Sequence, residues 1–263
     1  MDFMQKTAII VPCYNEANRL DGPAFAQFAK VNKIISFFFV NDGSTDRTAE
    51  ILHEICTTNP TQMRCIDFNK NLGKAEAVRQ GSLEALKEDF VNIGYWDADL
   101  ATPLRSIDAM CSCLESSDTA IVIGSRVRLL GRKIKRRALR HYLGRLFATL
   151  ASMLLRLPIY DTQCGAKIFR KSDDLKKALK IPFKVKWTFD VELLARFILI
   201  KRGRKGNDVG ARWVEYPLEE WTDVKGSKVG YLDFLKIGTE LAKLFFLLYI
   251  PAAHDRYTRA ILS

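Results

Sequence analysis

Residues 91–99 carry the sequence Val-Asn-Ile-Gly-Tyr-Trp-Asp-Ala-Asp, a mostly apolar run that ends in two carboxylates. The run predicts a buried strand over 91–96, which would hold Asp97 and Asp99 at its end. Mg²⁺ and Mn²⁺ prefer hard oxygen ligands and are commonly held by one or two carboxylates, with phosphates and water in the other positions. The stretch therefore favours a divalent-cation site that serves phosphate chemistry. A lone Asp-x-Asp can also be a solvated turn, so the interpretation depends on the rest of the chain.

Apolar runs alternate with helical periodicity on both sides of this stretch. The predicted strands cover residues 7–11, 34–40, 63–68, 91–96 and 119–124, and the predicted helices cover 23–32, 44–57, 73–86 and 106–115. Three successive phenylalanines at 37–39 lack polar alternation, which suits a strand buried on both faces. Such alternation is typical of an α/β fold, Rossmann-like, with a mainly parallel sheet and helices on both faces.

A polar cluster follows each of four predicted strands, over residues 12–16, 41–46, 69–74 and 97–99. Ligands of open parallel sheets bind beyond the carboxyl ends of the strands. Together the clusters can offer aromatic and carboxylate contacts to a base and ribose, a lysine to phosphates and a metal to a diphosphate. The candidate residues are Pro12, Tyr14, Glu16, Asn41, Asp42, Lys74 and Asp97. Each cluster alone could be an ordinary turn or a helix entrance.

The formal charge of +11 is unevenly placed, with nine Lys or Arg and no acid over residues 126–145. A basic excess attracts phosphates of nucleic acid, nucleotide or anionic lipid alike. Leucines and a phenylalanine recur at helical spacing over 139–157, and basic residues flank the start of this helix. An amphipathic basic helix of this kind can lie on an anionic membrane surface. The alternative is a core-facing helix with a solvated basic rim.

The remaining pattern predicts strands at 167–170 and 212–216, helices at 173–180 and 189–201, and a closing helix at 231–250. We expect a catalytic domain over 1–230, with a donor half to about residue 125 and an acceptor half over 126–230. Residues 231–263 form the expected amphipathic helical segment facing the membrane. The apolar run 244–250 is far shorter than the about 20 residues that cross a bilayer. The protein is therefore expected to lie on a membrane and not to span it.

Length, composition and cysteine spacing indicate the size of the core and the cellular compartment. The chain has 263 residues, 48% of them hydrophobic, which is enough to bury a large core. No apolar stretch precedes the first predicted strand, so neither a signal peptide nor a transit peptide is expected, and the prediction is a cytoplasmic protein. Six cysteines occur without a C-x-x-C pair. They favour buried thiols over disulfides or zinc ligands.

Three motifs resemble family 2 glycosyltransferases of the GT-A type: Val-Pro-x-Tyr-Asn-Glu at 11–16, Asn-Asp-Gly-Ser-x-Asp at 41–46 and Asp-x-Asp at 97–99. Within that family, residues 161–165, 187–194 and 220–228 are most similar to dolichyl-phosphate beta-glucosyltransferases and their prokaryotic relatives. The resemblance implies inverting transfer of a sugar from a nucleotide sugar, commonly UDP-glucose, to a polyprenyl phosphate at the cytosolic membrane face. Leu100 and Ala166 depart from the relatives, which often have glycine and an aromatic residue there.

Roles follow for individual residues. Mg²⁺ or Mn²⁺ on Asp97 and Asp99, with Arg126 nearby, would neutralise the charge that builds on the departing diphosphate. A lipid phosphate is already an anion and needs positioning more than a base, so Arg137 and Arg140 are the candidates for holding it. Asp161 is the third catalytic candidate, with Asp99 and Arg126. Asp161 and Asp190 could order the acceptor site, or could cap a helix or pair with a lysine.

Three other functions compete with this prediction. A glycosyltransferase acting on a polysaccharide or other non-lipid acceptor would keep the donor half without needing the basic amphipathic helix. A sugar nucleotidyltransferase would carry a Gly-rich basic loop after the first strand, where this chain has residues 12–16. A nucleic-acid-binding protein could use the arginines but would leave the Asp pair without a purpose, so no nucleic-acid partner is expected.

Overall fold

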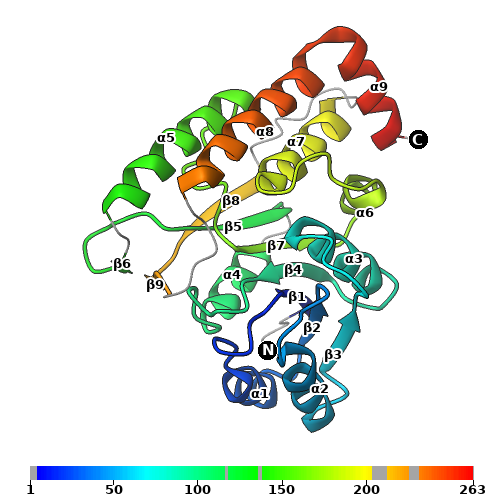
Figure 1. The fold of residues 1–263 in the computed structure, drawn as a ribbon, viewed down its shortest axis with the longest axis vertical. Coiled ribbons are helices and arrows are strands. Elements are labelled where there is room, and N and C mark those ends of the chain that lie inside the picture. The colour runs from blue at the N-terminus through cyan, green and yellow to red at the C-terminus, as the bar shows by residue number, and fades with distance from the viewer. Residues whose placement is uncertain (1–4, 116–117, 136–137, 203–211, 225–230, 263) are drawn as a thin grey trace.

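The computed structural model describes residues 5–115, 118–135, 138–202, 212–224 and 231–262 (Figure 1). Within these residues the central sheet has seven strands in the order β3-β2-β1-β4-β7-β5-β8. They are β1 (Thr7–Cys13), β2 (Ile35–Asn41), β3 (Met63–Asp67), β4 (Asn92–Trp96), β5 (Ile121–Ser125), β7 (Ala166–Arg170) and β8 (Trp213–Pro217). The short strands β6 (Lys133–Lys135) and β9 (Glu220–Thr222) pair with each other. The predicted α/β fold with a mainly parallel sheet is confirmed.

Helices cover both faces of the sheet (Figure 1). They are α1 (Gly22–Val31), α2 (Thr48–Thr58), α3 (Lys74–Leu86), α4 (Ser106–Glu115), α5 (Ala138–Leu155), α6 (Asp173–Lys180), α7 (Phe189–Arg202), α8 (Tyr231–Tyr249) and α9 (Pro251–Leu262). Side chains of α1, α2 and α4 pack on one face in one buried cluster. Those of α3 and of α5 to α9 form a second cluster on the other face. The strands alternate between the two clusters, because successive side chains of a strand point to opposite faces.

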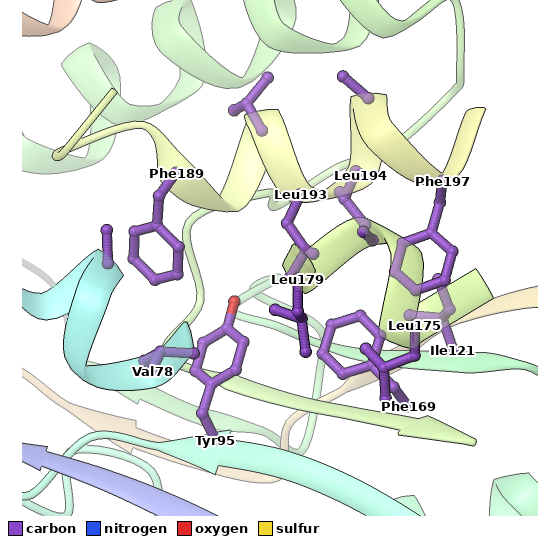
Figure 2. Close-up of a cluster of buried hydrophobic side chains, with 14 of the residues drawn as sticks. Val78, Tyr95, Ile121, Phe169, Leu175, Leu179, Phe189, Leu193, Leu194 and Phe197 are labelled. Atoms are coloured by element: carbon purple, nitrogen blue, oxygen red, sulfur yellow. The ribbon is translucent and has the colours of Figure 1, made fainter. Parts of the chain in front are cut away.

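Aromatic rings fill the second cluster between the sheet and α7, as Figure 2 shows. Phe169 stacks on Tyr95 with ring centroids 6.2 Å apart and on Phe197 with centroids 5.8 Å apart. The buried Arg196 of α7 bonds to Glu192 at 2.7 Å and to the carbonyl oxygens of Ala178 and Ile181, also at 2.7 Å. A buried arginine is tolerated only with such full pairing. These contacts fix α7 firmly above the sheet.

β7 is the irregular member of the sheet. It runs antiparallel to both neighbours, with Ala166 opposite Trp96 of β4 and Lys167 opposite Ile123 of β5. The start of β7 therefore lies at the same edge as the carboxyl ends of the parallel strands. That direction brings residues 161–165, just before β7, beside the loop that follows β4.

The structure differs from the prediction at two helices. The predicted helix 44–57 begins at Thr48, because Asp46 Oδ1 accepts from the Thr48 amide at 3.0 Å and holds the preceding turn outside the helix. The predicted closing helix 231–250 is followed by a second helix, α9, which begins at Pro251. Proline at the first helical position lacks only an amide that would be unpaired there anyway.

The leucine stripe predicted for α5 divides between two environments. Phe147 and Leu154 are buried in the core, while Leu146 is 61% exposed. Met153, which the stripe did not include, is 69% exposed. The helix thus has a core face and a separate apolar surface. Among the described helices, none is long and apolar enough to cross a bilayer.

The prediction of buried thiols holds for only half of the cysteines. Cys13, Cys111 and Cys164 are buried. Cys56, Cys65 and Cys113 are only half-buried, and they pack against the edge of the buried cluster that includes α1, α2 and α4. None of the six forms a disulfide in the structure.

Candidate functional site

A cavity of about 700 Å³ lies beyond the carboxyl ends of β1, β2 and β4. Its walls also include residues of α5 and of the segment before α7. Nine of the residues predicted for the site line it: Pro12, Tyr14, Glu16, Asp42, Lys74, Asp97, Asp99, Arg126 and Asp161. The topology brings them together because the parallel strands end at one edge of the sheet.

The two carboxylates after β4 are tightly placed. The Asp97 amide donates to the Gly165 carbonyl at 3.1 Å, and Asp99 Oδ1 accepts from the Ala101 amide at 3.2 Å. Leu100 has a positive φ of 52°, so the chain turns sharply behind the pair. Lys74 Nζ lies 2.5 Å from Asp97 Oδ1, and Arg19 Nη1 lies 3.7 Å from Asp99 Oδ2. Two cationic side chains, Lys74 and Arg19, therefore already lie beside the carboxylates.

The electrostatics at this end of the cavity favour a cation. Burial, and then the neighbouring negative charge of Asp97, raise the pKa of Asp99. A bound cation relieves both effects, because it stabilises the charged form of each carboxylate. Two hard oxygen donors on one loop beside an open cavity fit Mg²⁺ or Mn²⁺, which take their remaining ligands from phosphates and water. The residues therefore fit the predicted metal.

Hydrogen bonds of Asn41 and Asp42 fix the loop that follows β2. Asp42 accepts from the amides of Leu72 and Gly73 at 2.7 and 2.8 Å, and burial raises the pKa of its carboxyl group. Asn41 lies under the loop and outside the cavity lining, where its Nδ2 donates to Asp67 Oδ1 at 2.8 Å and its Oδ1 accepts from the Ser44 amide at 3.1 Å. Asn41 shapes the loop, and Asp42 lies at the cavity.

Glu16 and Arg19 form a salt bridge in the loop that follows β1. Arg19 Nη2 lies 2.6 Å from Glu16 Oε1, and its Nε donates to Glu16 Oε2 at 2.9 Å. The Glu16 amide donates to Thr48 Oγ1 at 2.7 Å, which ties the loop to α2. This fork brings Arg19 into the cavity next to Asp99. Sequence reasoning missed Arg19, although its position three residues after Glu16 suits such a pair.

Arg126 and Asp161 form a buried bidentate pair on the opposite wall. Arg126 Nε and Nη2 donate to Asp161 Oδ2 and Oδ1 at 2.6 and 2.8 Å. Burial opposes the charge of Arg126, but the Asp161 carboxylate outweighs it and raises the pKa of the guanidinium. The guanidinium also lies over the Trp221 ring, 5.3 Å from its centroid. Arg126 is therefore permanently charged and fixed in orientation.

Asp190 lines the cavity and lies in the first turn of α7. Its Oδ1 accepts from the buried Lys167 Nζ at 2.6 Å and also from the Tyr95 hydroxyl. Lys167 in turn donates to the Cys164 carbonyl at 2.6 Å. The alternative of a lysine pair for Asp190 is thus the one that the structure shows. The network links β4, β7 and α7 beneath the two carboxylates.

The far end of the cavity is lined by both cationic and apolar groups. Arg145 of α5 donates to the Tyr160 carbonyl at 2.8 Å and stacks on the Tyr160 ring at 3.6 Å. Trp187, Phe147 and Ile237 supply apolar walls. Trp187 and Trp221 also line the cavity, and the buried Trp221 packs in the core as well. Sequence reasoning missed Arg145, whose only signal was membership of the basic stretch.

Two of the predicted residues cannot be placed at the cavity. Arg137 lies outside the described residues. Arg140 falls within the backbone of α5, and its side chain lies outside the described part of the structure. Both stay predictions.

Comparison with known proteins adds a family and close relatives. The model of a family described as glycosyl transferase family 2 matches residues 8–176. A dolichyl-phosphate beta-glucosyltransferase of Saccharomyces cerevisiae is 32% identical, over 89% of this chain and 72% of that protein. One from Trichomonas vaginalis is 31% identical, over 90% of this chain and 70% of that protein.

A solved structure resembles the fold. Glucosyl-3-phosphoglycerate synthase of Mycobacterium tuberculosis, in complex with Mn²⁺, UDP and glucosyl-3-phosphoglycerate, superposes with a TM-score of 0.61 at 16% identity. The match covers 92% of this chain and 79% of that one. The GT-A type predicted from the motifs is thereby confirmed for the fold.

Proposed function

Because the chain belongs to glycosyl transferase family 2, we propose that it moves a hexose, glucose in the first instance, from a UDP-sugar to a polyprenyl phosphate. The enzyme class, a glycosyltransferase, follows from the family. The acceptor class is that of its dolichyl-phosphate relatives. The observation that carries the proposal is a single cavity whose lining includes the paired carboxylates as well as a cation, Arg145, and apolar side chains.

The carboxylate end is the donor site in this proposal. The base and ribose lie against Pro12, Tyr14 and Asp42, with the diphosphate toward Asp97 and Asp99. Mg²⁺ or Mn²⁺ on these two carboxylates would neutralise the charge that builds on the departing diphosphate. Lys74 and Arg19 already lie within 4 Å of the pair. They are placed to hold phosphate oxygens, because cations stabilise the same developing charge.

The other end suits a lipid phosphate. Such an acceptor is an anion at neutral pH, so attack on the anomeric carbon needs alignment and charge shielding more than proton removal. Arg145 is positioned by its stack on Tyr160 and can offer further N–H groups to a phosphate. Trp187 and Ile237 are suited to the first isoprene units. Attack from the face opposite the leaving diphosphate would invert the anomeric centre.

The Arg126–Asp161 pair is proposed to position the acceptor wall. Asp161 engages both ends of its carboxylate with Arg126, so it is poorly placed to accept a proton. Its role is to hold Arg126 charged and facing the cavity. The donor half, residues 1–125, and the acceptor half, 126–230, then meet at this cavity, and 231–263 complete the lipid side.

Peripheral attachment to the cytosolic face of a membrane forms part of the proposal. Tyr142 and Leu146 of α5 are 71% and 61% exposed, and Phe245 and Phe246 of α8 are 51% and 59% exposed. The two helices touch where the Tyr249 hydroxyl donates to the Leu154 carbonyl at 2.6 Å. Apolar side chains on neighbouring helices beside a basic stretch are typical of binding to anionic bilayers.

One experiment tests the proposal directly. The purified protein is incubated with Mn²⁺ or Mg²⁺, radiolabelled UDP- and GDP-sugars and undecaprenyl phosphate, and label is measured in the chloroform phase. We expect label there only with the phosphorylated lipid, so undecaprenol is the matched control acceptor. Label that remains in the aqueous phase with every donor, while a soluble acceptor becomes glycosylated, would contradict the lipid acceptor.

A further inference from the structure

A second group of potential metal ligands lies between α2 and the edge strand β3, away from the cavity. The side-chain ligand atoms of His53, Cys65 and Asp67 lie within 4.8 Å of one another. His53 Nε2 is 3.0 Å from Asp67 Oδ2, and Cys65 Sγ is 3.8 Å from the same oxygen. None of these residues lines the donor cavity. The proposed function leaves them without a role.

His53 lies on α2, and Cys65 and Asp67 lie two residues apart on the neighbouring strand β3, so the side chains of Cys65 and Asp67 share one face of the strand. Cys56, three residues after His53 on α2, is not one of this group. The helix and the strand therefore present an imidazole, a thiol and a carboxylate whose ligand atoms lie close together.

We propose that His53, Cys65 and Asp67 form a binding site for a single Zn²⁺ ion, with water as the fourth ligand. Zinc takes nitrogen, sulfur and carboxylate donors in a tetrahedron, whose edges at ordinary bond lengths are roughly 3.3–3.8 Å. The distances from Asp67 Oδ2 to His53 Nε2 and to Cys65 Sγ, 3.0 and 3.8 Å, lie close to that range. The Cys65 thiol disfavours Mg²⁺ and Mn²⁺, which prefer all-oxygen sites. Binding would release the Cys65 thiol proton to solvent, because zinc coordinates thiolates.

The surroundings support a site more than a chance surface pair. Asp67 Oδ1 accepts from Asn41 Nδ2 at 2.8 Å, which leaves Oδ2 directed at His53 and Cys65. A carboxylate oriented by a second hydrogen bond is the usual arrangement around bound metals. His53 and Asp67 have 59% and 40% of their side chains exposed, so an ion can enter from solvent. The absence of a C-x-x-C pair hid this group in the sequence, because its ligands come from two elements.

The test is a titration of the metal-free, phosphine-reduced full chain with Co²⁺ and with Zn²⁺. We expect one equivalent of Co²⁺ to give thiolate-to-cobalt charge-transfer and tetrahedral d–d bands that one equivalent of Zn²⁺ abolishes. Cys65→Ser and His53→Ala should lose these bands and weaken zinc binding at least tenfold. Cys113→Ser, a half-buried cysteine on α4, is the matched control and should behave like the unaltered protein.

Two further measurements keep the outcome unambiguous. Asp99→Asn should retain the thiolate bands, which separates this site from the proposed catalytic metal. Thermal melts of each metal-free variant show whether a lost signal merely reflects unfolding. Absence of thiolate-to-cobalt bands in the folded unaltered protein would overturn the proposal, as would bands that survive in folded Cys65→Ser and His53→Ala. Neither result bears on sugar transfer.

Discussion

The Asp97 carboxylate occupies the space into which a side chain at Gly165 would project. A β-carbon built on Gly165 overlaps the carboxyl group of Asp97 itself. The two residues are also joined by the Asp97 amide, which donates to the Gly165 carbonyl at 3.1 Å. Glycine is thus required at 165 by close approach and not by a positive φ. The turn before β7 sets the position of a proposed metal ligand.

Gly165→Ala is therefore expected to displace the Asp97 carboxylate. A shift of about 1 Å in a catalytic group can lower activity by about 10²-fold, so we expect a loss of that order in transfer rate. Gly238→Ala is the matched control, because a β-carbon there meets nothing within 4 Å. Steady-state kinetics of both variants check this. Normal turnover in Gly165→Ala would show that the position of Asp97 is unimportant.

Asp99→Asn should abolish transfer without loss of stability. Burial and the Asp97 charge raise the pKa of Asp99, so the ionised form is less favourable in the folded protein than in the unfolded chain. Between the ordinary pKa and the raised one, the folded state binds more protons, and stability falls as pH rises. The neutral amide removes this cost, so the melting temperature measured in EDTA at pH 7 should stay equal or rise. A clear fall would contradict our account of the pair.

Removal of the metal is also expected to inactivate the unaltered protein. EDTA should stop transfer, and added Mn²⁺ or Mg²⁺ should restore it, while Asp99→Asn stays inactive at every metal concentration. Full transfer in EDTA-treated protein shown by elemental analysis to be metal-free would remove the metal from the mechanism. The lysine and arginine beside the carboxylates would then have to carry the diphosphate charge alone.

Arg145→Ala should impair use of the lipid acceptor more than use of the donor. A charge-assisted hydrogen bond contributes about 1.5–3 kcal/mol, which corresponds to a roughly tenfold to hundredfold rise in KM for polyprenyl phosphate. The KM for the UDP-sugar should stay the same. Arg256→Ala, on the exposed side of α9, is the control. Replacing Arg137 and Arg140 by alanine is expected to act in the same direction, and equal losses in acceptor and donor assays would exclude a phosphate role.

Leu146→Glu with Met153→Glu should weaken membrane binding. Both side chains are more than 60% exposed, so the changes should leave the fold intact. Burying such side chains in lipid contributes about 1.5–3 kcal/mol each, and we expect at least a tenfold drop in binding to anionic vesicles. Val31→Glu, on the equally exposed surface of α1, is the matched control. Sedimentation with vesicles measures it, and unchanged binding of the double variant would place the membrane surface elsewhere.

Much of the donor site could be predicted because the local pattern determines it. Apolar runs that end in polar clusters define where parallel strands stop, so Asp42, Lys74 and Asp97 were placed correctly beside one cavity. Arg19 was missed, since its spacing from Glu16 is compatible with a pair but does not reveal that the side chain also approaches Asp99. Asn41 belongs to the same motif as Asp42 but lies below the loop, because adjacent residues point in opposite directions.

The other wall of the cavity depends on long-range pairing. Residues 167–170 were predicted as a strand, but strand direction is not encoded in apolar periodicity, and only the antiparallel direction brings Asp161 and Gly165 to Asp97. The position of Arg145 depends likewise on how α5 packs over that wall. The division of the α5 stripe between core and surface follows from neighbours far away in the chain, α7 and α8.

The antiparallel direction of β7 also affects how the chain can fold during its synthesis on the ribosome. β5 has β7 and β8 as its sheet neighbours, and both are synthesised after it. Until β7 emerges, β4 presents an unpaired edge, and unpaired edges invite association with other chains. A nascent chain halted at the end of β5 would hold both aspartates proposed to bind the metal, yet lack the turn that fixes one of them. Folding and assembly of the proposed catalytic centre are therefore completed in the same late step.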